Sequence, residues 1–207
     1  VSYDGTSVDN SGGSISVYAT GGATGINAVS LYGGADVTNA SDISAVGLVF
    51  GATGISAYAG GDVNIDNSGD IYVVSLYGDA IGLYAYSVYG DATVNNSGAI
   101  FAYSASGIAD GIFASGANVE VGNSGDLYAV GGTWAAGIEA QGTDSTSVDN
   151  SGDVFAYSLG AAYGIYATGG DVTVANSGNV EAQGYYATGI EVRSTGDVSV
   201  DNSGDIV

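Results

Sequence analysis

The stretch that decides the fold runs from residue 123 to residue 150 and reads NSGDLYAVGGTWAAGIEAQGTDSTSVDN. It opens on the tripeptide Asn-Ser-Gly and arrives at the next Asn 27 residues later. Between the two Asn residues lie short runs of alternating apolar and polar residues, separated by Gly, Ser, Thr or Asp. Alternation with a period of two is typical of a half-buried β-strand. The stretch therefore predicts three short strands joined by tight turns.

The same unit recurs along the whole chain. Its anchors are 29, 28, 29, 27, 27, 26 and 26 residues apart, and each of the seven units also carries a Gly followed by Ile or Leu near its middle. Self-similarity at a fixed period is the sequence signature of a solenoid. The anchors are Asn10, Asn39, Asn67, Asn96, Asn123, Asn150, Asn176 and Asn202, of which Asn39 opens a degenerate Asn-Ala-Ser copy.

The composition of the unit selects the kind of solenoid. A helical repeat needs long stretches rich in Ala, Leu, Glu and Lys, and the chain has none. Three strands per unit instead predict an all-β fold, a right-handed, three-faced parallel β-helix of about seven coils of 26–29 residues. The right hand is expected because parallel crossover connections are strongly biased toward it. We expect residues 1–207 to form one solenoid domain, either a segment of a longer chain or a protomer that polymerises.

The anchor Asn residues have a mechanical interpretation. In the quoted stretch the alternation places Leu127, Ile138 and Val148 in the interior, and the same parity places Asn150 there too. Strands of adjacent coils lie about 4.8 Å apart, so each side-chain amide can donate to the amide oxygen of the next coil. We therefore predict a structural ladder of all eight anchors. Asn and the Gly that follows it also suit a left-handed backbone at this corner.

Charge restricts the possible partners and chemistry. The chain has 22 acidic residues, one basic residue (Arg193), no His and no Cys, for a formal net charge of -21. Nucleic acid and anionic membranes are therefore excluded as partners, and no apolar run is long enough to enter a bilayer. Nucleophilic triads and dyads cannot form without His or Cys. A carboxylate pair for glycoside hydrolysis should interrupt the repeat, and we expect no interruption, no catalytic residue and no enzyme.

The Asp residues follow the repeat. One series comes just after the Asn corner and another opens the third strand, which is the behaviour of turn residues. Stacked oxygen-rich turns can coordinate Ca²⁺, and this alternative stays open. The Gly-rich nonapeptide of calcium-binding β-rolls is absent, so we expect no cofactor and no dedicated metal site. The two series are Asp42, Asp70, Asp126, Asp153 and Asp205, and Asp36, Asp62, Asp91, Asp171 and Asp197.

Aromatic residues on the outward positions are the candidate interface. The alternation predicts that they lie in rows that run from coil to coil. Such rows can stack internally and fix the register of the strands, or they can form an exposed apolar stripe that packs against another rod or against carbohydrate. The candidate residues are Tyr72, Phe101, Tyr128, Phe155, Tyr103 and Tyr157 on the first strands, and Tyr84, Phe113 and Tyr166 on the second strands.

The motif V-x-N-S-G-x-I, with its mid-coil Gly-Ile and Gly-Asp turn, resembles the passenger regions of bacterial autotransporters and related filamentous-haemagglutinin-like secreted proteins. The resemblance extends from Val8 to Ile206. It implies a right-handed β-helix, export to the cell surface, and a role in adhesion, aggregation or biofilm. We therefore expect a non-catalytic extracellular rod or fibre subunit that acts by self-association, head to tail or laterally, or by adhesion to a surface, with surface glycan as a candidate partner. A neutral-glycan-binding module that uses the aromatic stripes is the alternative.

Overall fold

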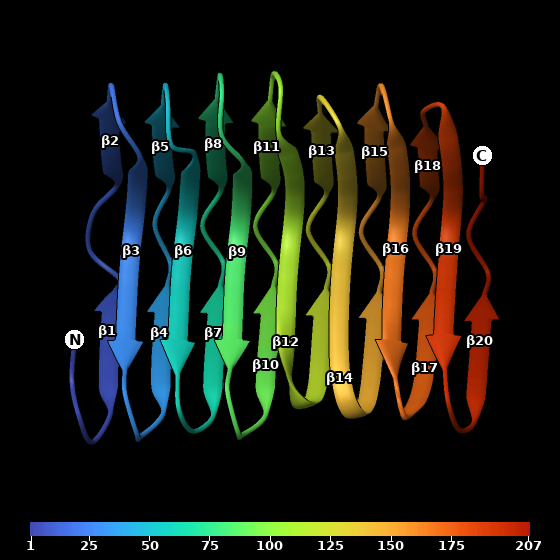
Figure 1. Cartoon of the computed structure of the whole chain (residues 1–207), viewed down its shortest axis with the longest axis horizontal. Helices are drawn as coiled ribbons and strands as arrows, with labels where there is room; N and C mark the ends of the chain where they lie inside the picture. The colour runs from blue at the N-terminus through green and yellow to red at the C-terminus, as the bar shows by residue number, and fades with distance from the viewer.

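The computed structural model describes residues 1–207, and all of its regular structure is β-strand. Three faces wind around one axis (Figure 1). Face one consists of β2 (Ile15–Ala19), β5 (Ile43–Gly47), β8 (Ile71–Ser75), β11 (Ile100–Ser104), β13 (Leu127–Gly131), β15 (Val154–Ser158) and β18 (Val180–Gln183). These strands form a seven-stranded sheet, one strand per coil.

The other two faces merge into one sheet of thirteen strands. Face two consists of β3 (Ala23–Ser30), β6 (Ala52–Ala59), β9 (Ala80–Ser87), the first parts of β12 (Ile108–Asn123) and β14 (Trp134–Asn150), β16 (Ala161–Gly169) and β19 (Tyr186–Ser194). Face three consists of β1 (Thr6–Asn10), β4 (Ala35–Asn39), β7 (Val63–Asn67), β10 (Ala92–Asn96), the second parts of β12 and β14, β17 (Asp171–Asn176) and β20 (Val198–Asn202).

The winding is right-handed. As the chain passes from left to right in Figure 1, β3, β6 and β9 run down the near side and β2, β5 and β8 run up the far side. Every strand pairs in parallel with its equivalent in the next coil, as where Val37 faces Ile65 and Ile65 faces Val94. The predicted parallel β-helix of about seven coils is thus confirmed.

The apolar residues of each alternating strand point into the interior of the solenoid. A single cluster of 42 buried residues, all of them Ala, Val, Ile or Leu, fills the space between the faces. Leu127 and Ile138 have no exposed surface and Val148 has 1%. Ala at alternate inward positions, such as Ala129 and Ala140, leaves room for the larger chains because the three sheets converge on a narrow core.

The Asn ladder lies at the corner between face three and face one. Each Asn Nδ2 donates to the Oδ1 of the next Asn at 2.6 to 2.8 Å, from Asn10 to Asn202 without a gap. From Asn39 onward, the second amide hydrogen goes to a backbone carbonyl two residues on, such as that of Gly125 for Asn123. The six anchors from Asn39 to Asn176 are at most 3% exposed. The predicted ladder is confirmed.

The reason for the corner glycine differs from the one we expected. No non-Gly residue has a positive φ, and the only glycines that do are Gly5 and Gly51, both outside the Asn-Ser-Gly corners. A Cβ on Gly125 would instead overlap the carbonyl oxygen of Gly98 in the preceding coil. The corner needs Gly because adjacent coils approach closely there, and the prediction of a left-handed backbone was wrong.

Candidate functional site

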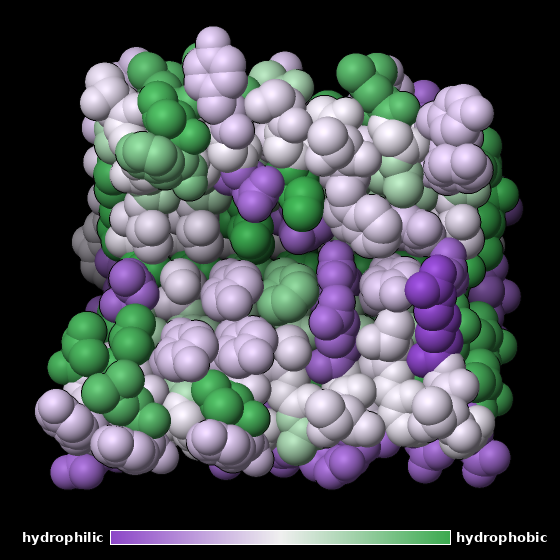
Figure 2. Space-filling view, in the orientation of Figure 1, coloured by the Kyte–Doolittle hydropathy of each residue, from purple (hydrophilic) through white to green (hydrophobic).

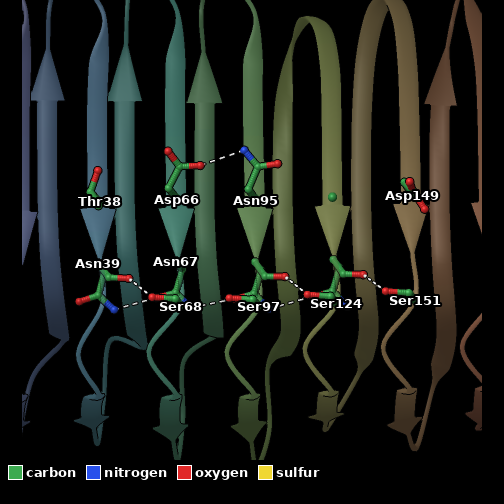
Figure 3. Close-up of a pocket in the computed structure, with 13 residues that line it drawn as sticks. Thr38, Asn39, Asp66, Asn67, Ser68, Asn95, Ser97, Ser124, Asp149 and Ser151 are labelled. Atoms are coloured by element: carbon green, nitrogen blue, oxygen red, sulfur yellow. Dashed lines mark hydrogen bonds between the residues drawn. The ribbon is translucent and has the colours of Figure 1, made fainter. Parts of the chain in front are cut away.

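A polar groove runs along the Asn corner (Figure 3). Asn, Ser, Asp and Thr side chains line it and no hydrophobic residue does. The interior amides have no hydrogen left to offer, because each donates once to the ladder and once to the backbone. The Ser hydroxyls next to them make only long contacts, 3.4 Å from Ser124 to the carbonyl of Asn96. The groove is therefore a structural seam, as the sequence predicted for its Asn residues.

The turn carboxylates also serve the stacking of coils. The backbone N–H of Ala99 donates to Oδ1 of Asp70 at 2.9 Å, and the N–H of Asp91 donates to Oδ1 of Asp62 at 3.0 Å. Each bond joins one coil to the next, so both Asp series act as turn acceptors. No three carboxylates of the structure gather closely enough to hold a metal ion.

The first outward row of face one carries four aromatic side chains in adjacent coils, Tyr72, Phe101, Tyr128 and Phe155. Tyr72 and Phe101 stack with centroids 5.2 Å apart and planes 8° apart. Tyr128 and Phe155 lie at 6.2 Å and are tilted by 42°. Tyr72 is 49% exposed and Tyr128 44%, while both Phe rings are half-buried. Tyr72 and Phe101 thus stack with each other, Tyr128 and Phe155 are tilted, and the row still presents the exposed edges of its two Tyr rings.

The second outward row of face one is less continuous. Tyr103 and Tyr157 belong to it, and Val130 lies between them in register. Both Tyr side chains are half-buried. The structure places these two candidates on the same face as the first row but does not bring them together.

Face two carries the other predicted aromatic residues. Tyr84 stacks on Phe113 at 5.1 Å with planes 8° apart, and Tyr86 stacks on Tyr58 at 5.5 Å with planes 3° apart. Burial raises the pKa of the Tyr84 hydroxyl, with the neighbouring Tyr86 and Tyr58 adding to the rise. Tyr166 lies in the same row beyond Glu139, so it is separated from this stack.

Sequence reasoning missed the most exposed aromatic side chains, which lie in turns. Phe50 and Tyr77 follow face-one strands and are 83% and 72% exposed, and Tyr32 and Tyr89 follow face-two strands and are 77% and 85% exposed. Apolar and aromatic side chains gather along the upper and lower-left edges of the view in Figure 2. The available signal was the pair of large residues placed just before a turn Gly, as in Val88-Tyr89-Gly90.

Sequence reasoning also missed an interruption of the repeat on face two. The residue before the mid-coil Gly is Asp in one coil only, Asp110, and its partners in register are Ile81 and Ala136. Asp110 is 4% exposed, and its Oδ1 is shielded from solvent and receives no hydrogen bond. Burial raises the pKa of this carboxyl well above its usual range, with smaller contributions from Glu139 and Asp79. The expectation that nothing interrupts the repeat was wrong.

Glu139 lies next to Asp110 on the same face. Gln141 donates a hydrogen bond from Nε2 to Oε1 of Glu139. Burial raises the pKa of Glu139, and hydrogen bonds from the side chains of Gln141 and Trp134 lower it again in part. Arg193 lies further along the face, paired with Glu191 at 2.6 Å and placed over the ring of Tyr166.

The ionisable side chains with shifted pKa values all lie on face two. All five groups with a shifted pKa, namely Tyr84, Asp110, Glu139, Tyr163 and Arg193, belong to its strands. Such clustering is typical of functional sites, although ion pairs also produce it. Face two therefore carries all of the side chains whose pKa is shifted.

Comparison with known protein families, curated proteins and solved structures finds no match for this chain. No helix of the structure could span a membrane. The fold and the side-chain geometry are therefore the observations on which a function can be argued.

Proposed function

We propose that this chain is a non-catalytic extracellular rod or fibre subunit on a bacterial-type cell surface, which acts by self-association or by adhesion to another surface. The observation that carries the proposal is the first aromatic row of face one. Its exposed members, Tyr72 and Tyr128, are held in line by the coil register. A regular stripe of amphipathic rings suits contact with a second extended surface.

The shape of the molecule supports the same role. The coils stack without a break, so each face repeats similar side chains along the axis (Figure 1). The resemblance of the Asn-Ser-Gly repeat to autotransporter passenger regions favours a location on the outside of the cell. A long, regular and repetitive surface favours many weak contacts over a single enclosed site.

The outer coils offer a second route to assembly. Asn202 Nδ2 donates to the carbonyl of Gly204 at 2.7 Å and has no further Asn to donate to, and Oδ1 of Asn10 receives no amide hydrogen. The next coil on either side, whether it belongs to the same chain or to a second copy, would find the ladder open. A stacked copy would continue the ladder and the parallel sheets together.

Charge should control this assembly. The net charge of -21 repels a second copy, and dissolved salt screens exposed charges beyond about 10 Å at 0.1 M. Association should therefore strengthen between 20 mM and 500 mM NaCl. Millimolar CaCl₂ should strengthen it further if the Asp turns bridge neighbouring rods.

The test is negative-stain electron microscopy with sedimentation velocity at both salt concentrations. We expect filaments or lateral bundles at high salt. The double variant Tyr72→Ser/Tyr128→Ser should lose lateral association, whereas Tyr185→Ser should retain it, because Tyr185 is 79% exposed but lies outside the row. Dispersed short particles under all conditions would contradict self-association.

A second candidate function, a neutral-glycan-binding module, is favoured by ring geometry. The pairs Tyr72–Phe101, Tyr84–Phe113 and Tyr58–Tyr86 stack with planes within 8° of each other and form ridged aromatic platforms of parallel ring edges. The apolar C–H groups of a sugar ring can pack against such a surface. Binding of neutral oligosaccharides by dispersed particles would favour this function over the fibre.

A further inference from the structure

The interruption on face two brings Asp110, Glu139 and Trp134 onto adjacent coils. Asp110 replaces the Thr, Ile, Ala or Tyr of the equivalent positions, and Glu139 replaces the aromatic side chain of its neighbours Phe113 and Tyr166. Trp134, the only Trp of the chain, opens the strand that carries Glu139. A site is a single place, and Asp110 is the one acidic residue at its position in the repeat.

Asp110 has no structural role comparable to that of the other Asp residues. The turn carboxylates accept backbone N–H groups from the next coil, as Asp79 does from Ile108 at 2.9 Å. Oδ1 of Asp110 is cut off from solvent and has no protein partner. A buried polar atom without a partner is unusual in a folded protein and calls for an explanation, such as a function or a missing ligand. No protein group offsets the cost of burying this carboxyl, which points to a partner outside the protein.

Aromatic side chains flank the carboxyls on one side. Trp134 and Tyr163 have centroids 4.5 Å apart, and Tyr166 meets Trp134 edge-on at 5.9 Å. Trp134 is half-buried, so part of its ring remains open to a ligand. The cluster therefore offers an aromatic surface beside two carboxyl groups.

The chemistry of the cluster selects its ligand class. An anion is excluded, because Asp79, Asp110 and Glu139 surround the site and Arg193 is paired with Glu191. A multivalent cation is disfavoured, because no three carboxylates converge to ligating distance. A purely apolar ligand would leave Oδ1 of Asp110 without a partner. A ring with hydroxyl donors and an apolar C–H face satisfies both the carboxyls and the aromatic surface.

We propose that Asp110, Glu139 and Trp134 form a binding site for a neutral sugar unit on face two. The Trp134 ring packs against the C–H face of the sugar and the Glu139 carboxyl binds its hydroxyl groups. A further hydroxyl group reaches Oδ1 of Asp110 once the side chains that shield this atom move aside. Gln141 orients Glu139 through its hydrogen bond and acts as a positioning residue. The inference gives a location and a ligand to the glycan-binding candidate function and rests on it, whereas the fibre function does not require it.

The test uses the single Trp as a built-in reporter. The intact chain is titrated with glucose, galactose, mannose, N-acetylglucosamine and their neutral tetrasaccharides while Trp134 fluorescence is recorded. We expect a saturable change with at least one of them. Asp110→Asn and Glu139→Gln should each weaken that binding by about threefold or more, since a hydrogen bond between uncharged groups is worth about 0.5–1.5 kcal/mol.

Glu181→Gln is the matched control. Glu181 also accepts a hydrogen bond from a Gln two residues on, Gln183, but lies on face one. This variant should leave binding unchanged, and circular dichroism should show that all three variants are folded. The proposal is overturned if no saccharide produces a saturable change, if both face-two variants bind as the wild type does, or if CaCl₂ alone gives a signal that Asp110→Asn abolishes.

The result separates the proposals. Filaments without any saccharide response would overturn this inference and leave the fibre function in place. Saccharide binding by the face-two variants at wild-type strength would overturn this site while supporting a glycan-binding module that uses the aromatic platforms.

Discussion

Removal of one rung from the middle of the Asn ladder should destabilise the protein strongly. Asn123 accepts a hydrogen bond from Nδ2 of Asn96 at 2.8 Å and donates to Oδ1 of Asn150 and to the carbonyl of Gly125, both at 2.7 Å. Asn123→Ala deletes all three bonds. It leaves one donor and two acceptors without a partner at a site that is 3% exposed in the wild type.

The magnitude follows from these three groups. Each buried polar group left without a partner costs about 1–3 kcal/mol, and relaxation or an entering water molecule recovers part of that. We therefore expect Asn123→Ala to lower the free energy of unfolding by about 3–5 kcal/mol. Asn123→Asp should cost at least as much, because a carboxylate cannot donate to Asn150 or Gly125 and would add a buried charge.

The assay is urea denaturation followed by far-UV circular dichroism, with hydrogen exchange at the backbone amides of Ser124 and Ser151. These amides bond across adjacent coils next to the rung, at 2.8 Å to the carbonyls of Asn96 and Asn123. Their exchange should accelerate in Asn123→Ala. Solenoid stability is a sum of coil and neighbour terms, so the loss should be local first and global second.

The control lies next to the ladder on face three. Asn95 precedes Asn96, points outward, and donates to Oδ1 of Asp66 at 2.9 Å in an exposed position. Asn95→Ala should change the free energy of unfolding by about 0.5 kcal/mol or less, because water replaces the lost partner. If Asn123→Ala and Asn95→Ala differ by less than about 1 kcal/mol, the ladder does not stabilise the fold as argued here.

Three further predictions concern single side chains. Burial raises the pKa of Asp110, so the folded chain holds the carboxyl proton more tightly than the unfolded chain does. The stability linked to this proton is lost as pH rises through the folded pKa. In thermal circular dichroism, Asp110→Asn should therefore melt at a higher temperature than the wild type at pH 8, and the difference should shrink at pH 5. In urea denaturation, Gly137→Ala should lower the free energy of unfolding by about 1–3 kcal/mol, because the added Cβ would overlap Val154 and lie 2.7 Å from the carbonyl oxygen of Gly164. Gly12→Ala is the control and should leave the free energy of unfolding unchanged, because its Cβ would meet nothing within 4 Å. Asp70→Ala should cost about 0.5–1.5 kcal/mol through loss of its bond from the Ala99 N–H and should speed exchange of that amide; wild-type exchange would refute the capping role.

The fold was predictable because the sequence repeats. Parity assigns inward and outward positions, and the repeat length places equivalent positions in register, so Leu127, Val148 and the Asn residues could be assigned to the interior without any distance. The aromatic rows followed from the same register. Whether two rings in a row stack flat, as Tyr72 and Phe101 do, or tilt, as Tyr128 and Phe155 do, depends on side-chain rotamers that the repeat does not encode.

The features that sequence reasoning missed depend on neighbours in other coils. Asp110 occupies an outward position by its place in the repeat, yet side chains from adjacent coils, where its register partners are Ile81 and Ala136, leave it 4% exposed. The corner glycine is required by a carbonyl oxygen of the preceding coil, a contact that no local propensity reports. Turn aromatic residues such as Tyr89 protrude because the chain loops outward at the corners.

The central claim is that residues one repeat apart lie side by side on adjacent coils, and engineered disulfides test it directly because the chain has no Cys of its own. Ser147 pairs with Thr173, and Thr173 pairs with Ser199, all exposed on face three. Neighbouring strands lie about 4.8 Å apart, within disulfide range, and strands two coils apart lie at about twice that. The account predicts that Ser147→Cys/Thr173→Cys oxidises to an intramolecular disulfide and that Ser147→Cys/Ser199→Cys does not. The opposite result, or no disulfide in either variant, would contradict it.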